Sequence, residues 1–133
     1  MDWRNDKHYP DPTAALALAN VARDEKKPFV FICSPYAGDV ELDAMRARRY
    51  VRSAIGEGAI PFAPHILYPE VLDDGDLYER KMGLALGLAW LDKCDELWVF
   101  GRSISSGMRR EIIRAMKLEI RIRYFTEQCE EAS

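Results

Sequence analysis

The sequence predicts one three-layer α/β domain whose parallel sheet has four strands in the order 2-1-3-4. Short apolar runs rich in β-forming residues, such as FVFIC (29–33), alternate with longer helical patterns. Strands that alternate with helices in this way pair in parallel through right-handed crossovers. The chain has 133 residues, of which 48% are hydrophobic, and this length suits one domain with a real core but is too short for two.

Eight elements are expected between residues 12 and 125. The helices cover 12–26, 40–57, 77–94 and 107–118, and the strands cover 29–33, 59–64, 95–101 and 119–125. Pro12 is favoured in the first turn of a helix, and Gly58 ends the second helix. Pro61 cannot donate a ladder hydrogen bond, so its strand is expected at the edge of the sheet. Gly83 and Gly87 weaken the third helix but permit close packing on the sheet.

The remaining segments are expected to be irregular. Residues 65–76 read as a long loop, and the polar tail over 126–133 is expected to fray. The predicted organisation is therefore an N-terminal extension with a helix (1–27), one domain (28–125) and a tail. The Ala/Leu stripe of the first helix could cover the domain's own sheet or a second subunit, so a homo-oligomer stays open as an alternative.

Composition favours a small molecule as the partner. The formal net charge of −3 disfavours nucleic acid, and the Arg-rich stretches at 46–52 and 121–123 lack interleaved aromatic residues. No apolar run approaches the ~20 residues that cross a bilayer, and the N-terminus has no apolar signal core. The three cysteines show no CxxC or Cys/His pattern, so neither a disulfide framework nor a zinc site is expected and a cytoplasmic location fits best.

Two loops are expected to meet at one crevice. In open α/β sheets, ligands bind at the carboxyl ends of the strands beside the switch point, which here lies between the first and third strands. This brings together SPYAGD (34–39) and GRSISSGMRRE (101–111). In the second loop, Ser105 or Ser106 can cap the following helix, and Gly107 leaves the approach to its N-terminus open to an anion or a hydroxyl group.

Glu111 is the candidate nucleophile of that crevice. It lies on the flank of the apolar face that passes through Met108 and Ala115, so we expect it to be partly sheltered. A half-buried carboxylate can attack the anomeric carbon of a sugar as a base leaves. The alternative is an exposed carboxylate paired with Arg114, which would contribute only roughly 0.3 kcal/mol.

The first loop is open to two interpretations. Ser34 and the N–H groups around Gly38 could hold hydroxyl groups or phosphate, and Tyr36 could hydrogen-bond a carboxylate or stack on a base. Alternatively, the segment is a simple turn with Asp39 near the start of a helix. Neither GxGxxG nor GxxxxGK[ST] is present in the sequence.

A metal site is a weaker alternative at His65 and the acidic run that contains Asp73, Asp74 and Asp76. Its spacing matches neither a calcium loop nor a zinc helix. Helix capping and solvent exposure explain these carboxylates better, and no metal is expected.

Four segments taken together resemble the nucleoside 2-deoxyribosyltransferase-like superfamily, and most closely a group of small bacterial and phage-associated proteins within it. These segments are FICSPYAGD, AIPFAPHILYP, LDDGDLYER and CDELWVFGRSISSGMRREIIRA, and the resemblance covers roughly residues 28–125. It implies a flavodoxin-like, Rossmann-like parallel sheet. It also implies cleavage of the N-glycosidic bond of a nucleoside or nucleotide, by transfer to another base or by hydrolysis, without a cofactor.

The resemblance assigns roles to individual residues. The family nucleophile is a Glu four residues after a Gly, a spacing that Gly107 and Glu111 match. The family aromatic residue that orients the nucleophile corresponds to Tyr36, so the expected catalytic residues are Glu111 and Tyr36. The expected substrate-binding residues are Ser34, Pro35, Gly38, Asp39, His65, Gly101, Ser105, Ser106, Gly107 and Met108.

One departure from the family pattern bears on function. Characterised members carry an Asp on the helix before the third strand, where this chain has Gly87. Asp92 and Glu79 are imperfect replacements. The sequence therefore leaves two main hypotheses, an enzyme that acts through Glu111 and a nucleotide-binding or sensing module that keeps the fold without turnover. A third is an oligomeric scaffold, for which the Ala/Leu-rich N-terminal helix is the only hint.

Overall fold

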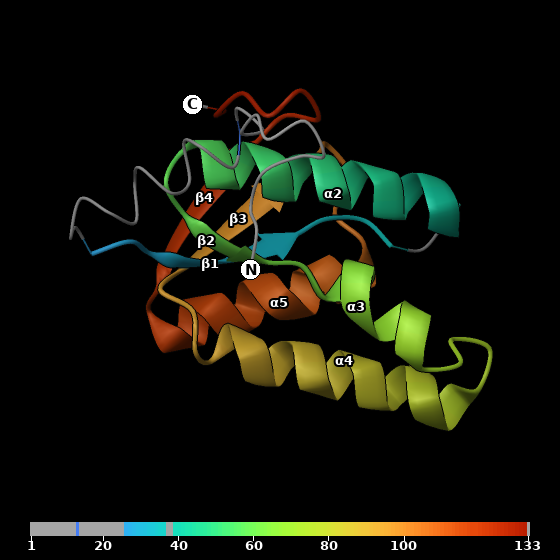
Figure 1. Cartoon of the computed structure of the whole chain (residues 1–133). Helices are drawn as coiled ribbons and strands as arrows, with labels where there is room; N and C mark the ends of the chain where they lie inside the picture. Colours follow the sequence, from blue (N-terminus) through green and yellow to red (C-terminus); the bar gives the residue numbers. More distant parts are fainter. Residues whose placement is uncertain (1–12, 14–25, 37–38, 133) are drawn as a thin grey trace, which may run out of the picture.

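The computed structural model of the protein describes residues 13, 26–36 and 39–132 (Figure 1). Its strands are β1 (Phe29–Cys33), β2 (Ile60–Phe62), β3 (Glu96–Phe100) and β4 (Arg121–Phe125). Its helices are α2 (Val40–Gly56), α3 (Pro64–Val71), α4 (Leu77–Leu91) and α5 (Ser106–Leu118). The helix expected over 12–26 lies, apart from its residues 13 and 26, outside the described residues.

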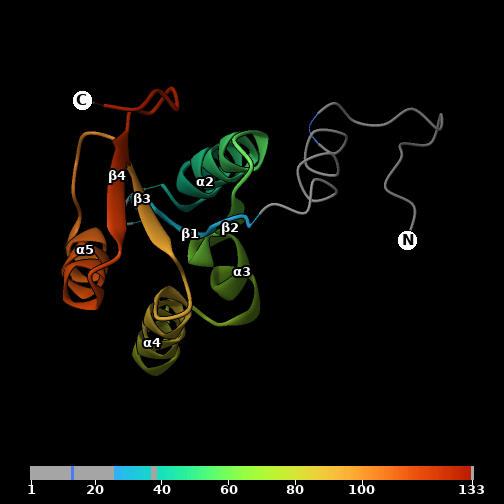
Figure 2. The ribbon, with the colours of Figure 1, turned by 90° about the vertical axis from the view of Figure 1, so that its left-hand side faces the viewer.

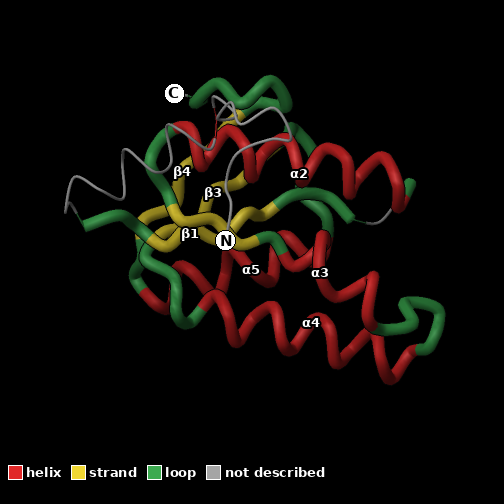
Figure 3. Tube along the Cα trace, viewed as in Figure 1, coloured by secondary structure: helices red, strands yellow, loops and turns green. Residues whose placement is uncertain are grey.

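The strands form one parallel sheet in the order β2-β1-β3-β4, which confirms the topology predicted from the sequence (Figure 2). Figure 3 shows the strands in yellow with the helices in red around them. β1 and β3 are neighbours at its centre, with Val30 opposite Glu96 and Cys33 opposite Val99. β2 lies at an edge, as the missing N–H of Pro61 predicts. Because all the strands run the same way, the loops that follow β1 and β3 leave the sheet side by side.

Alternate residues of β1 face two separate apolar clusters. Val30 and Ile32 pack in the cluster that includes Tyr50 of α2, whereas Phe31 and Cys33 pack in the cluster that α4 and α5 cover. This alternation is the two-residue period of a strand that is buried on both faces. Helix α2 lies on one side of the sheet and α4 and α5 on the other, so the domain has three layers (Figure 2).

The sequence predicts a loop over 65–76, whereas the structure has helix α3 there. Pro64 stands in the first turn, where a missing N–H is tolerated. The usual signals are weak, because no side chain caps the helix and Pro69 lies inside it. Packing compensates: the Tyr68 hydroxyl accepts a hydrogen bond of 2.8 Å from Trp90 Nε1 of α4.

The prediction that the tail frays is wrong for residues 126–132, which fold back along β4. The Ala132 N–H donates to the Tyr124 carbonyl at 2.8 Å. The Arg123 guanidinium donates two hydrogen bonds, of 2.8 and 2.6 Å, to the Glu131 carboxylate. These contacts form because the fold places β4 next to the tail. The composition of the tail alone does not indicate them.

Candidate active site

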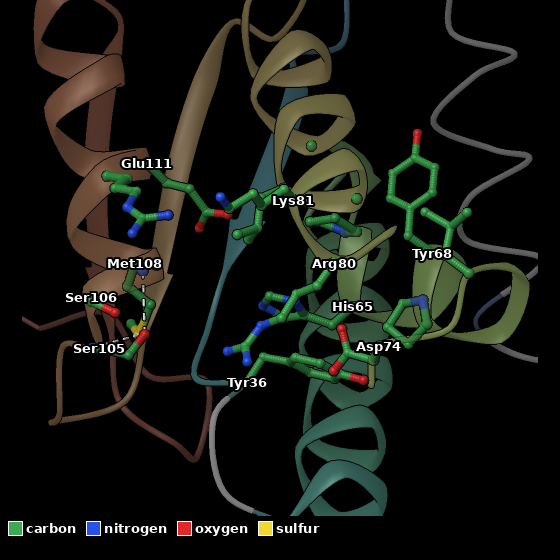
Figure 4. A pocket seen from close by; sticks show the side chains of 18 of the residues that line it. Tyr36, His65, Tyr68, Asp74, Arg80, Lys81, Ser105, Ser106, Met108 and Glu111 are labelled. Atoms are coloured by element: carbon green, nitrogen blue, oxygen red, sulfur yellow. Dashed lines mark hydrogen bonds between the residues drawn. The ribbon is translucent and has the colours of Figure 1, made fainter. Parts of the chain in front are cut away.

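A pocket of about 320 Å³ opens where the loops after β1 and β3 meet (Figure 4). Its walls come from these loops, from α3 and α4, and from the first turns of α5. The volume is within the range of small-molecule sites. The position, at the carboxyl ends of two adjacent parallel strands, is where ligands bind in open α/β sheets.

Ser105 fixes the start of α5 at the pocket. Its Oγ accepts a hydrogen bond of 3.2 Å from the Met108 N–H, and its own N–H donates to Met108 Sδ at 3.5 Å. This reciprocal pairing is a capping box in which a thioether takes the place of the usual Glu or Gln. The N–H groups of a first helical turn have no partner within the helix. Those of Ser106 and Gly107, which line the pocket, therefore favour an anion or a hydroxyl oxygen.

Replacing Ser105 by Ala is expected to lower the free energy of unfolding by about 1 kcal/mol, because the Met108 N–H loses its acceptor. Chemical denaturation measures this loss. Ser103→Ala is the matched control, since the Ser103 side chain is exposed and makes no hydrogen bond with a described residue. Equal losses in the two variants would contradict the capping role.

Glu111 enters the pocket from the second turn of α5 and is only 8% exposed. Its Oε1 has no hydrogen-bond partner among the described residues. Burial raises the pKa of this carboxyl group to about 7, and a hydrogen bond from the Cys33 thiol offsets part of the rise. Roughly half of the Glu111 carboxyl groups are therefore ionised at neutral pH.

The structure does not support an exposed Glu111 paired with Arg114. The Arg114 guanidinium instead donates two hydrogen bonds, of 2.8 and 2.6 Å, to the carboxylate of Asp92. Asp92 does not line the pocket, so it is not placed to supply the acid that the family resemblance implies at Gly87.

Tyr36 and His65 form a stacked pair on the wall that faces Glu111 (Figure 4). Their ring centroids are 4.9 Å apart and their planes differ by 14°. His65 Nε2 lies 2.7 Å from the Ser34 carbonyl oxygen, which can only accept, so Nε2 carries the proton. Burial lowers the pKa of His65, so the ring is neutral at pH 7 and its Nδ1 is an acceptor.

The Tyr36 hydroxyl group does not meet Glu111. Figure 4 shows it pointing away from Glu111, toward the side of the pocket where Asp74 lies. Its oxygen is buried and has no hydrogen-bond partner among the described residues. Burial raises the pKa of this phenol, and the carboxylates of Asp74, Asp43 and Glu70 add to the rise. The contact with Glu111 that the family resemblance implies is therefore absent between these two residues, and the phenol stays protonated.

Three buried polar atoms of the pocket have no partner within the described part of the chain. They are Ser34 Oγ, Tyr36 Oη and Glu111 Oε1. Two are hydroxyl groups that can donate, and the third is a carboxyl oxygen that can accept. An unpaired buried polar group costs on the order of 1–3 kcal/mol, and such groups are rare in native proteins. Their presence in one pocket indicates a ligand that carries several polar groups.

Most of the predicted site residues line this pocket, but Pro35, Asp39 and Gly101 do not. Asp39 instead caps α2, where its Oδ1 accepts from the Leu42 N–H at 3.0 Å. Gly101 follows β3 with φ of 98°, a backbone conformation that favours glycine, and turns the chain toward α5. Gly38 lies outside the described residues.

The wall formed by α3 and the start of α4 was not predicted from the sequence. Tyr68, Asp74, Arg80 and Lys81 line it, and Arg110 of α5 faces the same pocket. The side chains of Arg80, Lys81 and Arg110 form no salt bridge with a described residue. The sequence gives no signal for this wall, because apolar residues occur all round α4 and periodicity does not reveal which side meets the pocket.

Gly87 lines the pocket and packs against α3. A Cβ atom there would lie 3.5 Å from the Cβ atom of Pro64, an ordinary contact. Glu79 also lines the pocket, but its Oε1 accepts a hydrogen bond of 3.2 Å from the Asp73 N–H. Glu79 is thus tied to the loop before α4.

The acidic run before α4 shapes the start of that helix. Asp76 Oδ1 accepts a hydrogen bond of 2.8 Å from the Tyr78 N–H, and Asp73 Oδ1 accepts one of 2.9 Å from the Gly75 N–H. In the part of the chain that the structure describes, no three His, Cys, Asp or Glu side chains gather so that they could hold a metal ion.

No described helix combines the length and apolar character that a membrane span requires.

Comparison with known proteins supports the fold. Among solved structures, the chain is similar to the 2-deoxyribosyltransferase of the psychrotolerant bacterium Bacillus psychrosaccharolyticus, with a TM-score of 0.57 and 17% sequence identity. The similarity covers 74% of this chain and 72% of that chain. A comparison with curated proteins finds no match. Residues 28–125 match the family model described as Domain of unknown function (DUF7768), and the chain belongs to that family.

Proposed function

We propose that this protein cleaves the N-glycosidic bond of a nucleoside or nucleotide, with Glu111 as the nucleophile, and passes the sugar to another base or to water. The observation that carries the proposal is the buried Glu111 carboxyl group, unpartnered at Oε1, at the edge of the sheet where the loops after β1 and β3 meet. The fold shared with a 2-deoxyribosyltransferase supports the same chemistry.

The reaction has two displacements at C1′. The Glu111 carboxylate attacks C1′, a C1′–O bond forms, and the C1′–N bond breaks, with its electron pair leaving on the base, which takes up a proton. A second base or a water molecule then attacks C1′, opens the glycosyl ester and loses a proton. Transfer and hydrolysis differ only in this acceptor.

Burial prepares Glu111 for the first displacement. Its ionised form is poorly solvated, as the rise of its pKa to about 7 reflects. Attack on C1′ converts this buried charge into a neutral ester, so the cost of desolvation is relieved as the bond forms. The ionised fraction at neutral pH remains large enough for attack.

The hydroxyl and N–H groups around Glu111 suit the sugar and a 5′ substituent. Ser34 lies buried beside the stacked aromatic pair, and Ser105, Ser106 and Gly107 line the pocket at the N-terminus of α5. Ser106 precedes Glu111 by about 7.5 Å along the helix axis, a separation that a ribose and its 5′ oxygen can span. These groups would hold sugar hydroxyl groups or a phosphate.

The test is release of free base. Native protein incubated with a panel of deoxynucleosides and their monophosphates is expected to release base that chromatography detects. Glu111→Gln keeps the size of the side chain but removes the nucleophile, and is expected to slow release by on the order of 1,000-fold or more. Background rates for both proteins with every substrate would rule the proposal out.

A second candidate function is a nucleotide-binding or sensing module without turnover. Gly87 favours it, because this pocket residue stands where characterised members of the resembling family carry an acid. Calorimetric titration with nucleotides separates the two functions. Tight binding with intact ligand recovered afterwards would favour the module, whereas released base would favour the enzyme.

A further inference from the structure

The leaving base must lie across the pocket from Glu111. In a displacement at C1′, the nucleophile and the leaving group occupy opposite faces of the reacting carbon. The wall that faces Glu111 carries Tyr36, His65 and Asp74, and Arg80 extends into the pocket from α4 (Figure 4). We call these four residues the base side of the pocket. This placement rests on the proposed function.

We propose that Tyr36 acts on the leaving base rather than on Glu111, by donating a hydrogen bond to the acceptor atom next to the glycosidic nitrogen. The substrates are then N-glycosides whose base has an acceptor at that position, such as the carbonyl oxygen of a pyrimidine or the ring nitrogen of a purine.

The position of the Tyr36 hydroxyl group carries this proposal. Tyr36 lines the pocket, and its hydroxyl oxygen is buried and has no hydrogen-bond partner among the described residues. It points away from Glu111 (Figure 4). The phenol ring is held by stacking on His65, and His65 is held in turn by its 2.7 Å contact with the Ser34 carbonyl oxygen. The donor is therefore fixed on the base side before substrate binds.

The surroundings of Tyr36 favour a hydrogen-bond donor over a proton donor. Asp74, Asp43 and Glu70 are negative neighbours that oppose the formation of a phenolate. As the C1′–N bond breaks, its electron pair spreads into the base and negative charge gathers on the acceptor atom. A fixed donor aimed at that atom binds more strongly in the transition state than in the ground state.

This arrangement accounts for the absence of an acid at Gly87. When the Tyr36 hydroxyl group stabilises the negative charge that develops on the leaving base, departure of the base depends less on its protonation. Arg80 lines the same pocket and forms no salt bridge with a described residue, so its positive charge is available to the departing base. The base then takes its proton from solvent after the C1′–N bond has broken.

The experiment compares 5-fluoro-2′-deoxyuridine, 2′-deoxyuridine and thymidine, whose bases decrease in acidity in that order. The native protein is expected to cleave all three with rates that depend weakly on this acidity. Tyr36→Phe is expected to slow cleavage about 100-fold for thymidine and less than about 10-fold for the fluorinated substrate, because the better leaving group depends less on the donor. Tyr78→Phe, on an exposed part of α4, is the matched control and should retain native rates.

The outcomes separate the two roles. A loss of equal size with all three substrates in Tyr36→Phe would overturn the assignment, since a residue that orients Glu111 affects every leaving group alike. A steep dependence on acidity in the native protein would overturn it without any variant. If the native protein released no base from any of the three substrates, this inference and the proposed cleavage of pyrimidine nucleosides would both be overturned. The wider panel of deoxynucleosides and monophosphates would then test the proposed function separately.

Discussion

Between pH 5 and pH 8, the native protein is expected to lose about 2 to 3 kcal/mol of unfolding free energy relative to the Glu111→Gln variant. The pKa of Glu111 is raised from 4.5 to about 7 by burial. Between these two values the unfolded chain is ionised at this position while the folded chain still holds its proton, so stability falls as pH rises. The loss begins near pH 4.5 and is nearly complete above pH 7, and Gln cannot take part in it.

The comparison of two pH values isolates the ionisation of Glu111. Burying an amide in place of a carboxyl group changes stability by an amount that does not depend on pH, and this amount cancels in the difference. Chemical denaturation at pH 5, 6, 7 and 8 measures the difference in unfolding free energy between the native protein and the variant. If the unfolding free energies of the two proteins changed in parallel with pH, the pKa of Glu111 would be the same in the folded and the unfolded chain.

The same group should make kcat/KM for base release rise with pH through an apparent pKa of about 7, because only the carboxylate attacks.

Replacing Phe100 by Ala is expected to cost about 3 to 5 kcal/mol of unfolding free energy. Phe100 ends β3 and is fully buried. Its ring stacks on Tyr50 with centroids 4.3 Å apart and on Phe125 with centroids 4.8 Å apart. Truncation would remove both stacks and leave a cavity between the sheet and α2.

Phe29→Ala provides the control for this core variant. Phe29 begins β1 and is 50% exposed, so the same truncation should cost about 1 kcal/mol. Denaturation midpoints of the two variants give the comparison. If the two variants lost similar amounts of unfolding free energy, the stacking of Phe100 on Tyr50 and Phe125 would contribute little to stability. Base release by Phe100→Ala should also fall, since the loop that carries Ser105 starts directly after this residue.

The order of the sheet could be predicted from the sequence because it depends on features that are visible there. Continuous apolar runs mark strands buried on both faces, and Pro61 marks an edge. Helix α3 could not be predicted, since Pro69 and the missing cap argue against a helix that packing on Trp90 stabilises. The fold-back of residues 126–132 likewise depends on the pairing of Arg123 with Glu131.

The two loops of the candidate site could also be predicted, because parallel strands bring their carboxyl ends to one edge of the sheet. The burial of Glu111 follows from the helical period of α5. The direction of the Tyr36 hydroxyl group could not be predicted, because it is set by stacking on His65, which lies in the segment read as a loop. Asp74 and Arg80, which complete the base side of the pocket, could not be predicted from the sequence either.

The contact between Gly87 and Pro64 has a consequence for substitutions at this glycine. Because a Cβ atom at Gly87 would meet Pro64 at an ordinary distance, alanine fits there without moving α4 away from α3. The close packing of α4 on α3 therefore does not by itself require a glycine at this position.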